Sequence, residues 1–137
     1  MLFLQMHEED GMAQVIKVKR AYDPPDKDDG FRVLVDRLWP RGLKKEGLKI
    51  DLWLKAIAPS DVLRKWFSHE PDRWEEFRSH YFEELREEGE VVERLLKEAG
   101  SSKVITLVYA SREEKLNNAA ALKEYIEKEK LLGRKAA

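Results

Sequence analysis

Two apolar runs, far apart in the chain, restrict the folds open to this sequence more than any other feature. Phe31–Asp36 and Lys103–Tyr109 consist almost entirely of apolar, largely β-branched residues. Strands of this kind are covered on both faces and pair in parallel within sheets flanked by helices. Roughly sixty residues with helical signals separate the two runs, which is enough chain for right-handed crossovers between parallel strands.

A third strand is predicted at Val15–Arg20, where Ile16 and Val18 alternate with lysines. Alternation of this kind is typical of a half-exposed strand near a sheet edge. The loop Asp23–Gly30, with two prolines and a glycine, ends the strand. We therefore expect a small three-layer or two-layer α/β domain with a mostly parallel sheet and crossover helices.

Several residues mark where helices begin and end. Ser60 is expected to cap one helix, and Pro71 suits the first turn of the next. Gly89 should break that second helix. After the last strand, Ser111 and Glu114 have the spacing of a capping box, which predicts that the final helix begins there.

The chain of 137 residues is expected to form one domain over residues 14–130. Residues 1–13 lack the pattern of a signal peptide and are predicted to be a loosely ordered extension, and 131–137 a frayed tail. The absence of cysteine excludes disulfides, thiolate zinc sites and a thiol nucleophile. Together these features predict a cytoplasmic protein.

The charge balance excludes a general attraction to polyanions. The 26 lysine and arginine residues against 27 aspartate and glutamate residues leave a formal net charge of -1. An anion site therefore has to be a local cluster. No stretch approaches the length of a membrane span, so no membrane partner is expected.

The end of the second predicted strand holds the strongest candidate site. Arg32, Asp36, Arg37, Trp39 and Arg41 lie within ten residues of one another, and the last three fall in a loop stiffened by proline. Ligands bind open parallel sheets at the carboxyl ends of strands, and arginines on a rigid loop suit phosphate or carboxylate. A second interpretation stays open: Asp36 pairs with Arg32 or a neighbouring arginine, while Trp39 caps the core.

His69 is the histidine with the best setting for acid–base chemistry, because it lies between aromatic groups at a turn between helices. Asp36 and His69 are thus the candidate catalytic residues, although the position of His69 favours a turn or capping role over a catalytic one.

Polar residues also follow the third predicted strand. If the strands pair in parallel, Tyr109, Ser111, Asn117 and Asn118 lie beside the loop after Asp36. Asparagine is a poor helix former, so the pair of amides is a candidate for hydrogen bonding to a ligand. The alternative is a capped helix with two amides that face solvent.

Two segments come close to known phosphate-binding and calcium-binding motifs but do not match them. Gly42–Gly47 has the glycine spacing of a phosphate loop, but Leu48 stands where the lysine should be. The acidic loop Asp23–Gly30 has Pro25 at the first calcium-ligand position. We predict neither a metal site nor a cofactor.

Three motifs resemble one known family. They are Lys-Arg-Ala-Tyr-Asp-Pro at Lys19–Pro24, the run from Asp29 to Gly42 that ends Arg-Leu-Trp-Pro-Arg-Gly, and Arg-Trp-Glu-Glu-Phe at Arg73–Phe77. They resemble the YeaO-like family, whose function is unknown, over nearly everything after Gln14. The resemblance implies a small cytoplasmic α/β protein. The family usually reads Asn-His-Ala where this chain has an asparagine at position 118, which weakens any mechanism that needs a histidine there.

The first functional hypothesis is a pocket for a small anion, such as phosphate or a nucleotide-like molecule, at the strand ends. Arg37 and Arg41 would hold the anion, and Asp36 would orient them or act as a base. The hypothesis in this form is to be dropped if Arg37 and Arg41 point away from each other. The alternative is nucleic-acid binding through the basic loop 37–49, with Trp39 or Trp53 stacking on a base. A homodimer formed through exposed aromatic residues is the third.

Overall fold

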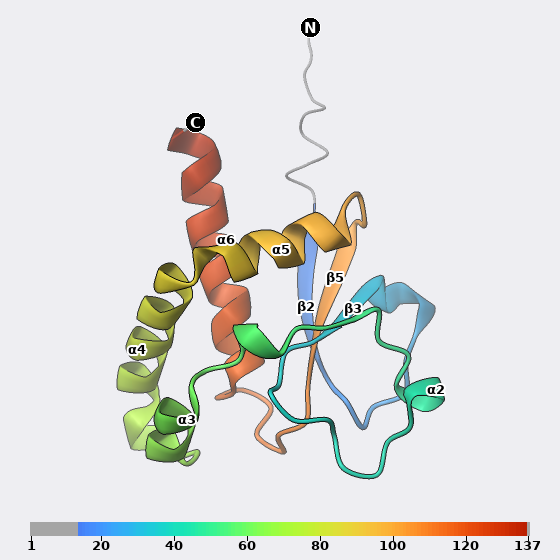
Figure 1. Cartoon of the computed structure of the whole chain (residues 1–137), viewed down its shortest axis with the longest axis horizontal. Coiled ribbons are helices and arrows are strands. Elements are labelled where there is room, and N and C mark those ends of the chain that lie inside the picture. The colour runs from blue at the N-terminus through green and yellow to red at the C-terminus, as the bar shows by residue number, and fades with distance from the viewer. Residues whose placement is uncertain (1–13, 137) are drawn as a thin grey trace, which may run out of the picture.

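The chain forms a four-stranded sheet in which every strand runs parallel to its neighbours, in the order β2-β5-β3-β4 (Figure 1). The computed structural model describes residues 14–136, with side chains as far as residue 129, so the predicted extension at 1–13 lies outside the described residues. The strands are β2 (Val15–Arg20), β3 (Phe31–Leu34), β4 (Leu52–Trp53) and β5 (Val104–Tyr109). The helices are α2 (Lys45–Leu48), α3 (Asp61–Phe67), α4 (Trp74–Glu87), α5 (Gly89–Ala99) and α6 (Asn118–Ala136), with 3-10 turns at η1 (Lys27–Asp29), η2 (Lys55–Ile57) and η3 (Pro71–Arg73).

The three strands predicted from the sequence are present and pair in parallel as expected. β5 lies between β2 and β3, with Ile105 opposite Ile16 on one side and Phe31 on the other. β2 is an edge strand, which agrees with its alternating residues. The sequence does not predict β4, because a strand of two residues leaves no periodic pattern.

One face of the sheet, the helical face, carries the main core. Ile16, Val33, Val35, Ile105 and Leu107 on this face pack against buried residues of α3, α4, α5 and α6. Figure 1 shows α3, α4 and α6 gathered to one side of the strands. Full burial of an aliphatic or aromatic side chain stabilises a fold by about 1.5–3 kcal/mol, so this face holds most of the stabilising burial.

The other face, the loop face, is covered by the segment from Trp39 to Trp53, which includes the short helix α2. Leu34 and Val108 of the sheet pack there against Leu48, with both tryptophans partly buried beside them. Long helices therefore cover only one face, and the domain has two main layers.

A buried polar cluster lies on the loop face. Arg32 Nη1 donates a hydrogen bond of 2.6 Å to Asp29 Oδ2, and its Nη2 and Nε donate to the carbonyls of Leu48 (2.8 Å) and Lys49 (3.1 Å). Lys19 Nζ lies 3.1 Å from the same Asp29 oxygen. Arg32 thus joins β3 to α2, and its carboxylate partner is Asp29 and not Asp36 as one interpretation of the sequence had it.

Most of the predicted helix boundaries are confirmed. Ser60 caps α3, since its hydroxyl oxygen accepts a hydrogen bond from the Leu63 N–H. Pro71 opens η3, which leads directly into α4. Gly89 is the first residue of α5, and Glu88 alone separates it from the end of α4.

The last helix begins later than the capping box at Ser111 and Glu114 predicts, and that prediction is wrong. α6 starts at Asn118, and Asn117 Oδ1 accepts a hydrogen bond of 2.8 Å from the Ala120 N–H. Asparagine is among the best N-cap residues, so Asn117 takes the capping role. The seven residues from Ser111 to Asn117, which the sequence predicted to be the start of the helix, therefore form a loop.

α6 is helical to Ala136, and fraying of residues 131–137 stays a prediction. In the described part of the chain, none of the helices is both long and apolar enough to cross a membrane.

Gly30 provides a test of how η1 meets β5. Its φ is 65°, and an added Cβ would lie 2.3 Å from the Val104 carbonyl oxygen. We expect Gly30→Ala to lower the free energy of unfolding by about 2 kcal/mol or more, because backbone strain and a clash with the main chain add together. Gly89→Ala is the control, since a Cβ there meets nothing within 4 Å. Equal denaturation midpoints for the two variants would contradict the close approach.

Asp29 tests the polar cluster. Burial opposes ionisation of its carboxyl, but the Asp26 N–H, Lys19 and Arg32 outweigh burial, so its pKa lies below the ordinary value. We expect Asp29→Asn to destabilise the fold by about 3 kcal/mol at neutral pH, because Arg32 loses its buried counter-ion. Since the pKa is lowered in the folded state, this stability is present above the ordinary pKa and disappears as the pH falls through the folded-state pKa. Urea titrations should show the two proteins converging at acidic pH; a constant difference would refute the assignment.

Candidate functional site

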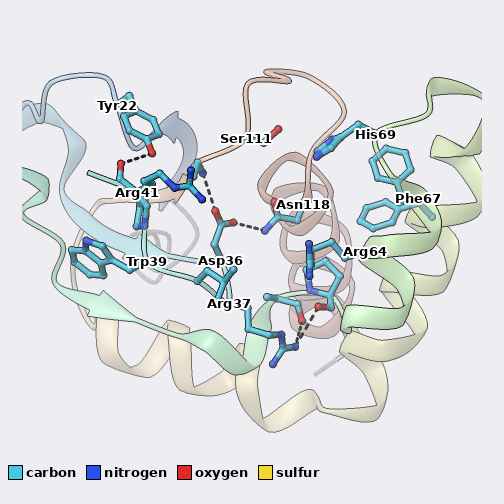
Figure 2. Close-up of a pocket in the computed structure, with 16 residues that line it drawn as sticks. Tyr22, Asp36, Arg37, Trp39, Arg41, Arg64, Phe67, His69, Ser111 and Asn118 are labelled. Carbon is cyan, nitrogen blue, oxygen red and sulfur yellow. Dashed lines mark hydrogen bonds between the residues drawn. The ribbon is translucent and has the colours of Figure 1, made fainter. Parts of the chain in front are cut away.

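A pocket of about 350 Å³ opens at the carboxyl ends of β3 and β5, where the sequence analysis placed the candidate site. Parallel pairing carries the loops after both strands to this edge of the sheet, and the turn after α3 closes the other side (Figure 2). The lining residues are Tyr22, Asp36, Arg37, Leu38, Trp39, Pro40, Arg41, Ala58, Pro59, Arg64, Phe67, His69, Phe77, Ala110, Ser111 and Asn118.

Asp36 links the two strand ends. Its Oδ2 accepts a hydrogen bond of 2.9 Å from the Ala110 N–H, directly after β5, and its Oδ1 accepts one of 3.1 Å from Asn118 Nδ2 at the start of α6. Burial raises the pKa of the Asp36 carboxyl above its ordinary value, and these two donors and the charge of Arg64 offset only part of that rise. Asp36 is thus a half-buried carboxylate that forms no ion pair with an arginine of the described part of the chain.

The arginines do not form the pair that the sequence suggested. Arg37 Nη2 donates to the carbonyls of Ala58 and Pro59, both at 3.3 Å. Figure 2 shows Arg37 and Arg41 on different sides of Asp36, with Arg37 directed away from Arg41. The arrangement in which these two guanidinium groups hold one anion together is therefore absent.

Arg41 and Arg64 are the arginines that stay available to a ligand. The Tyr22 hydroxyl donates a hydrogen bond of 2.8 Å to the Arg41 carbonyl and so fixes the Arg41 backbone. The Arg41 side chain has no polar partner among the side chains that the structure describes. Among the described residues, the Arg64 guanidinium has one polar partner, Asp61, at 3.3 Å in an exposed contact. Both arginines are exposed and line the pocket.

His69 lies in a strained turn at the pocket. Ser68 and His69 both adopt left-handed backbone conformations, with φ of 47° and 56°. Such conformations are unfavourable for residues other than glycine and tend to occur at functional sites. The imidazole centre lies 5.6 Å from the centre of the Phe67 ring, so the turn holds it against the aromatic wall.

The aromatic walls belong to the core as well as to the pocket. Phe67 and Phe77 stack with their ring centres 4.4 Å apart. Trp39 Nε1 donates a hydrogen bond of 2.6 Å to the Leu43 carbonyl, and Trp53 Nε1 donates one of 2.9 Å to the Asp36 carbonyl. Trp39 is partly buried against the core of the loop face, as the second interpretation of the sequence had it, and it also lines the pocket.

The structure brings most of the predicted site residues together. Asp36, Arg37, Trp39, Arg41, His69, Ser111 and Asn118 line the pocket. It places three others elsewhere: Arg32 in the polar cluster, Tyr109 in the core of the helical face, and Asn117 in the cap of α6. Alternation along a strand directs Arg32 and Tyr109 away from the pocket, and Asn117 is used to cap the helix.

Two residues that line the pocket, Arg64 and Tyr22, were not predicted from the sequence. Arg64 is one of several charged residues on α3, and nothing in the local pattern separates it from the others. Tyr22 precedes a proline-rich loop, and only the fold brings it against Arg41. Among the described residues, no three His, Asp or Glu side chains are arranged to hold a metal ion.

Titration of Asp36 tests the electrostatics of the pocket. We expect NMR titration to give a folded-state pKa above the ordinary value, and Arg64→Ala to raise it further by removing a favourable charge. Because the folded-state pKa is the higher one, the carboxyl lowers the free energy of unfolding as the pH rises through that value. Arg94→Ala, on α5 outside the pocket, should leave the titration unchanged. A pKa at or below the ordinary value would contradict burial as its cause.

Comparisons with known proteins agree with the fold and motifs. A family model described as "Inactive DUF488-N3 subclade" matches residues 15–136. An uncharacterised protein of Mycobacterium tuberculosis (strain ATCC 25618 / H37Rv) is 43% identical over 111 residues, or 81% of this chain and 92% of that protein. The uncharacterised protein YeaO of Escherichia coli (strain K12) is 40% identical over 111 residues, or 81% of this chain and 96% of that protein. No solved structure matches. The chain therefore belongs to the YeaO-like family, in the subclade described as inactive.

Proposed function

We propose that this protein binds a small anionic molecule, of nucleoside monophosphate type, in the pocket at the carboxyl ends of β3 and β5. The composition of the pocket carries the proposal: exposed arginines, aromatic walls and one half-buried carboxylate surround about 350 Å³. Ligand pockets typically enclose about 300–1,000 Å³ and combine apolar walls with a few polar groups. The carboxyl edge of an open parallel sheet is also where such ligands bind.

Arg41 and Arg64 are the anion-binding residues of this proposal. Both residues are exposed and line the pocket, and neither is neutralised in a buried ion pair among the described residues. Arg37 has a different role, because its Nη2 is occupied by two carbonyls that tie the β3 loop to the segment before α3. Charge-assisted hydrogen bonds from a planar guanidinium are well suited to phosphate oxygens.

Binding, and not turnover, is the proposed role. The family description calls the subclade inactive, and Asn118 stands where the resemblance to the family leads us to expect histidine. An amide cannot exchange a proton near neutral pH as an imidazole can. Asp36 and His69 stay the candidates for any residual chemistry, since both line the pocket.

The nucleic-acid alternative ranks second. Lys44, Lys45 and Lys49 are exposed on the loop, which favours it. The tryptophans do not, because Trp39 and Trp53 pack edge to face at 5.3 Å and Lys55 covers the second ring at 4.2 Å. A base could stack on them only after these contacts broke. A cytoplasmic location and a homodimer are further proposals that rest on the sequence alone.

Calorimetry of nucleoside monophosphates with the wild-type protein and two variants tests the proposal. We expect Arg41→Ala and Arg64→Ala each to weaken binding by about 10- to 100-fold, because each removes a charge-assisted hydrogen bond worth about 1.5–3 kcal/mol. Arg94→Ala should bind as the wild type does.

Salt separates the two functions in the same experiment. Binding to a compact pocket should change little between about 50 and 200 mM salt, whereas contacts with many phosphates of a nucleic acid would weaken by orders of magnitude. Binding of single-stranded DNA that Lys45→Ala weakens, together with no binding of nucleoside monophosphates, would overturn the pocket in favour of the loop.

A further inference from the structure

The amide of Asn118 has only one orientation that satisfies its neighbours. Its Nδ2 donates to the Val35 carbonyl and to Asp36 Oδ1, both at 3.1 Å. Both partners are acceptors, so a flipped amide would set oxygen against oxygen. The two amide hydrogens are thus used inside the protein, and the Asn118 oxygen faces away from both partners.

That oxygen is an unused acceptor. It receives no hydrogen bond from any described residue, and it is not among the buried polar atoms that lack a partner in the described structure. Asn118 lines the pocket, so its Oδ1 is open to a ligand there.

Asp36 adds further acceptors beside it. Each carboxylate oxygen accepts one hydrogen bond from the protein, from Ala110 or from Asn118, and each has a second lone pair. Figure 2 shows Asp36 and Asn118 side by side at the centre of the pocket. The Ala110 N–H and the amide group of Asn118 are occupied by protein acceptors, and the free lone pairs of Asp36 and Asn118 remain at this point. A ligand group placed here has to supply N–H or O–H donors, because an acceptor would meet three oxygens.

We propose that Asp36 and Asn118 form a subsite that accepts hydrogen bonds from adjacent N–H donors of a ligand, and that the ring of the ligand is guanine. This inference rests on the proposed function, since it assigns the end of the ligand opposite its phosphate. Guanine presents a ring N–H and an amino group side by side, which match the two oxygens of a carboxylate. The adenine edge has an amino group beside a ring nitrogen acceptor, so one carboxylate oxygen would face a lone pair.

The charges of the pocket give the ligand a direction. Asp36 is half-buried at the centre, whereas Arg41 and Arg64 are exposed. A phosphate at the exposed end and a donor-rich ring at the carboxylate meet opposite charges at both ends. The reversed ligand would set phosphate against Asp36.

Four nucleotides that differ at one edge provide the test. GMP, IMP, XMP and AMP carry the same ribose phosphate, and IMP lacks only the amino group of guanine. We expect calorimetry with the wild-type protein to show GMP binding at least about tenfold more tightly than the other three, the discrimination typical of a paired hydrogen-bond contact. Asp36→Asn should lose this preference and favour XMP, because an amide can donate to the carbonyl that replaces the amino group.

Asp72→Asn, in η3 outside the pocket lining, is the control and should keep the preference for GMP. Asp36→Asn can fail to fold, because its NH₂ group would face another donor, either the Ala110 N–H or the Asn118 NH₂ group. In that case the comparison of GMP with IMP on the wild-type protein tests the guanine subsite by itself. Equal binding of all four nucleotides, weakened by Arg41→Ala, would overturn the guanine subsite and leave the anion pocket standing. No binding of any of the four would overturn both.

Discussion

The parallel pairing of β3 with β5 is the constraint on which the rest of the structure depends. It joins Phe31–Leu34 to residues more than seventy positions later in the chain, so the intervening helices have to return across the sheet. It also brings the two strand ends to one edge, where the N–H that follows β5 reaches Asp36. The buried strands and the pocket are therefore consequences of one set of contacts, and the site is as stable as the sheet that carries it.

The two faces of the sheet are covered in different ways, and the difference determines where a site can form. Long amphipathic helices seal the helical face with apolar side chains. The loop face is sealed by an irregular segment, whose backbone polar groups need partners wherever water is excluded. Arg32 and the indole N–H groups of Trp39 and Trp53 supply donors to main-chain carbonyls of this region. An irregular cover held by side-chain hydrogen bonds leaves arginines such as Arg41 free to face the pocket.

The pocket separates opposite charges over a short distance. A carboxylate with a raised pKa lies at its centre, and two exposed arginines lie toward solvent. The carboxylate is held by donors that are neutral, so its charge stays available to a ligand and is not cancelled inside the protein. This arrangement suits recognition of a molecule with a donor-rich end and an anionic end. The proposed binding role agrees with a subclade described as inactive, because binding a ligand needs no exchange of protons.

The sequence by itself determined three of the four strands, their parallel pairing and the edge of the sheet where the polar residues gather, because apolar runs and helix-ending residues act through local periodicity. It could not show that Arg37 turns toward the carbonyls of Ala58 and Pro59, or that Arg64 from another helix lines the same pocket. It also misplaced the start of α6, since two capping residues competed and local spacing favoured the wrong one. The partners of a long polar side chain depend on which acceptors the packed fold brings within about 3 Å, and residues far apart in the chain supply them. Tertiary structure alone decided the partners of Asp36, and with them the chemistry of the site.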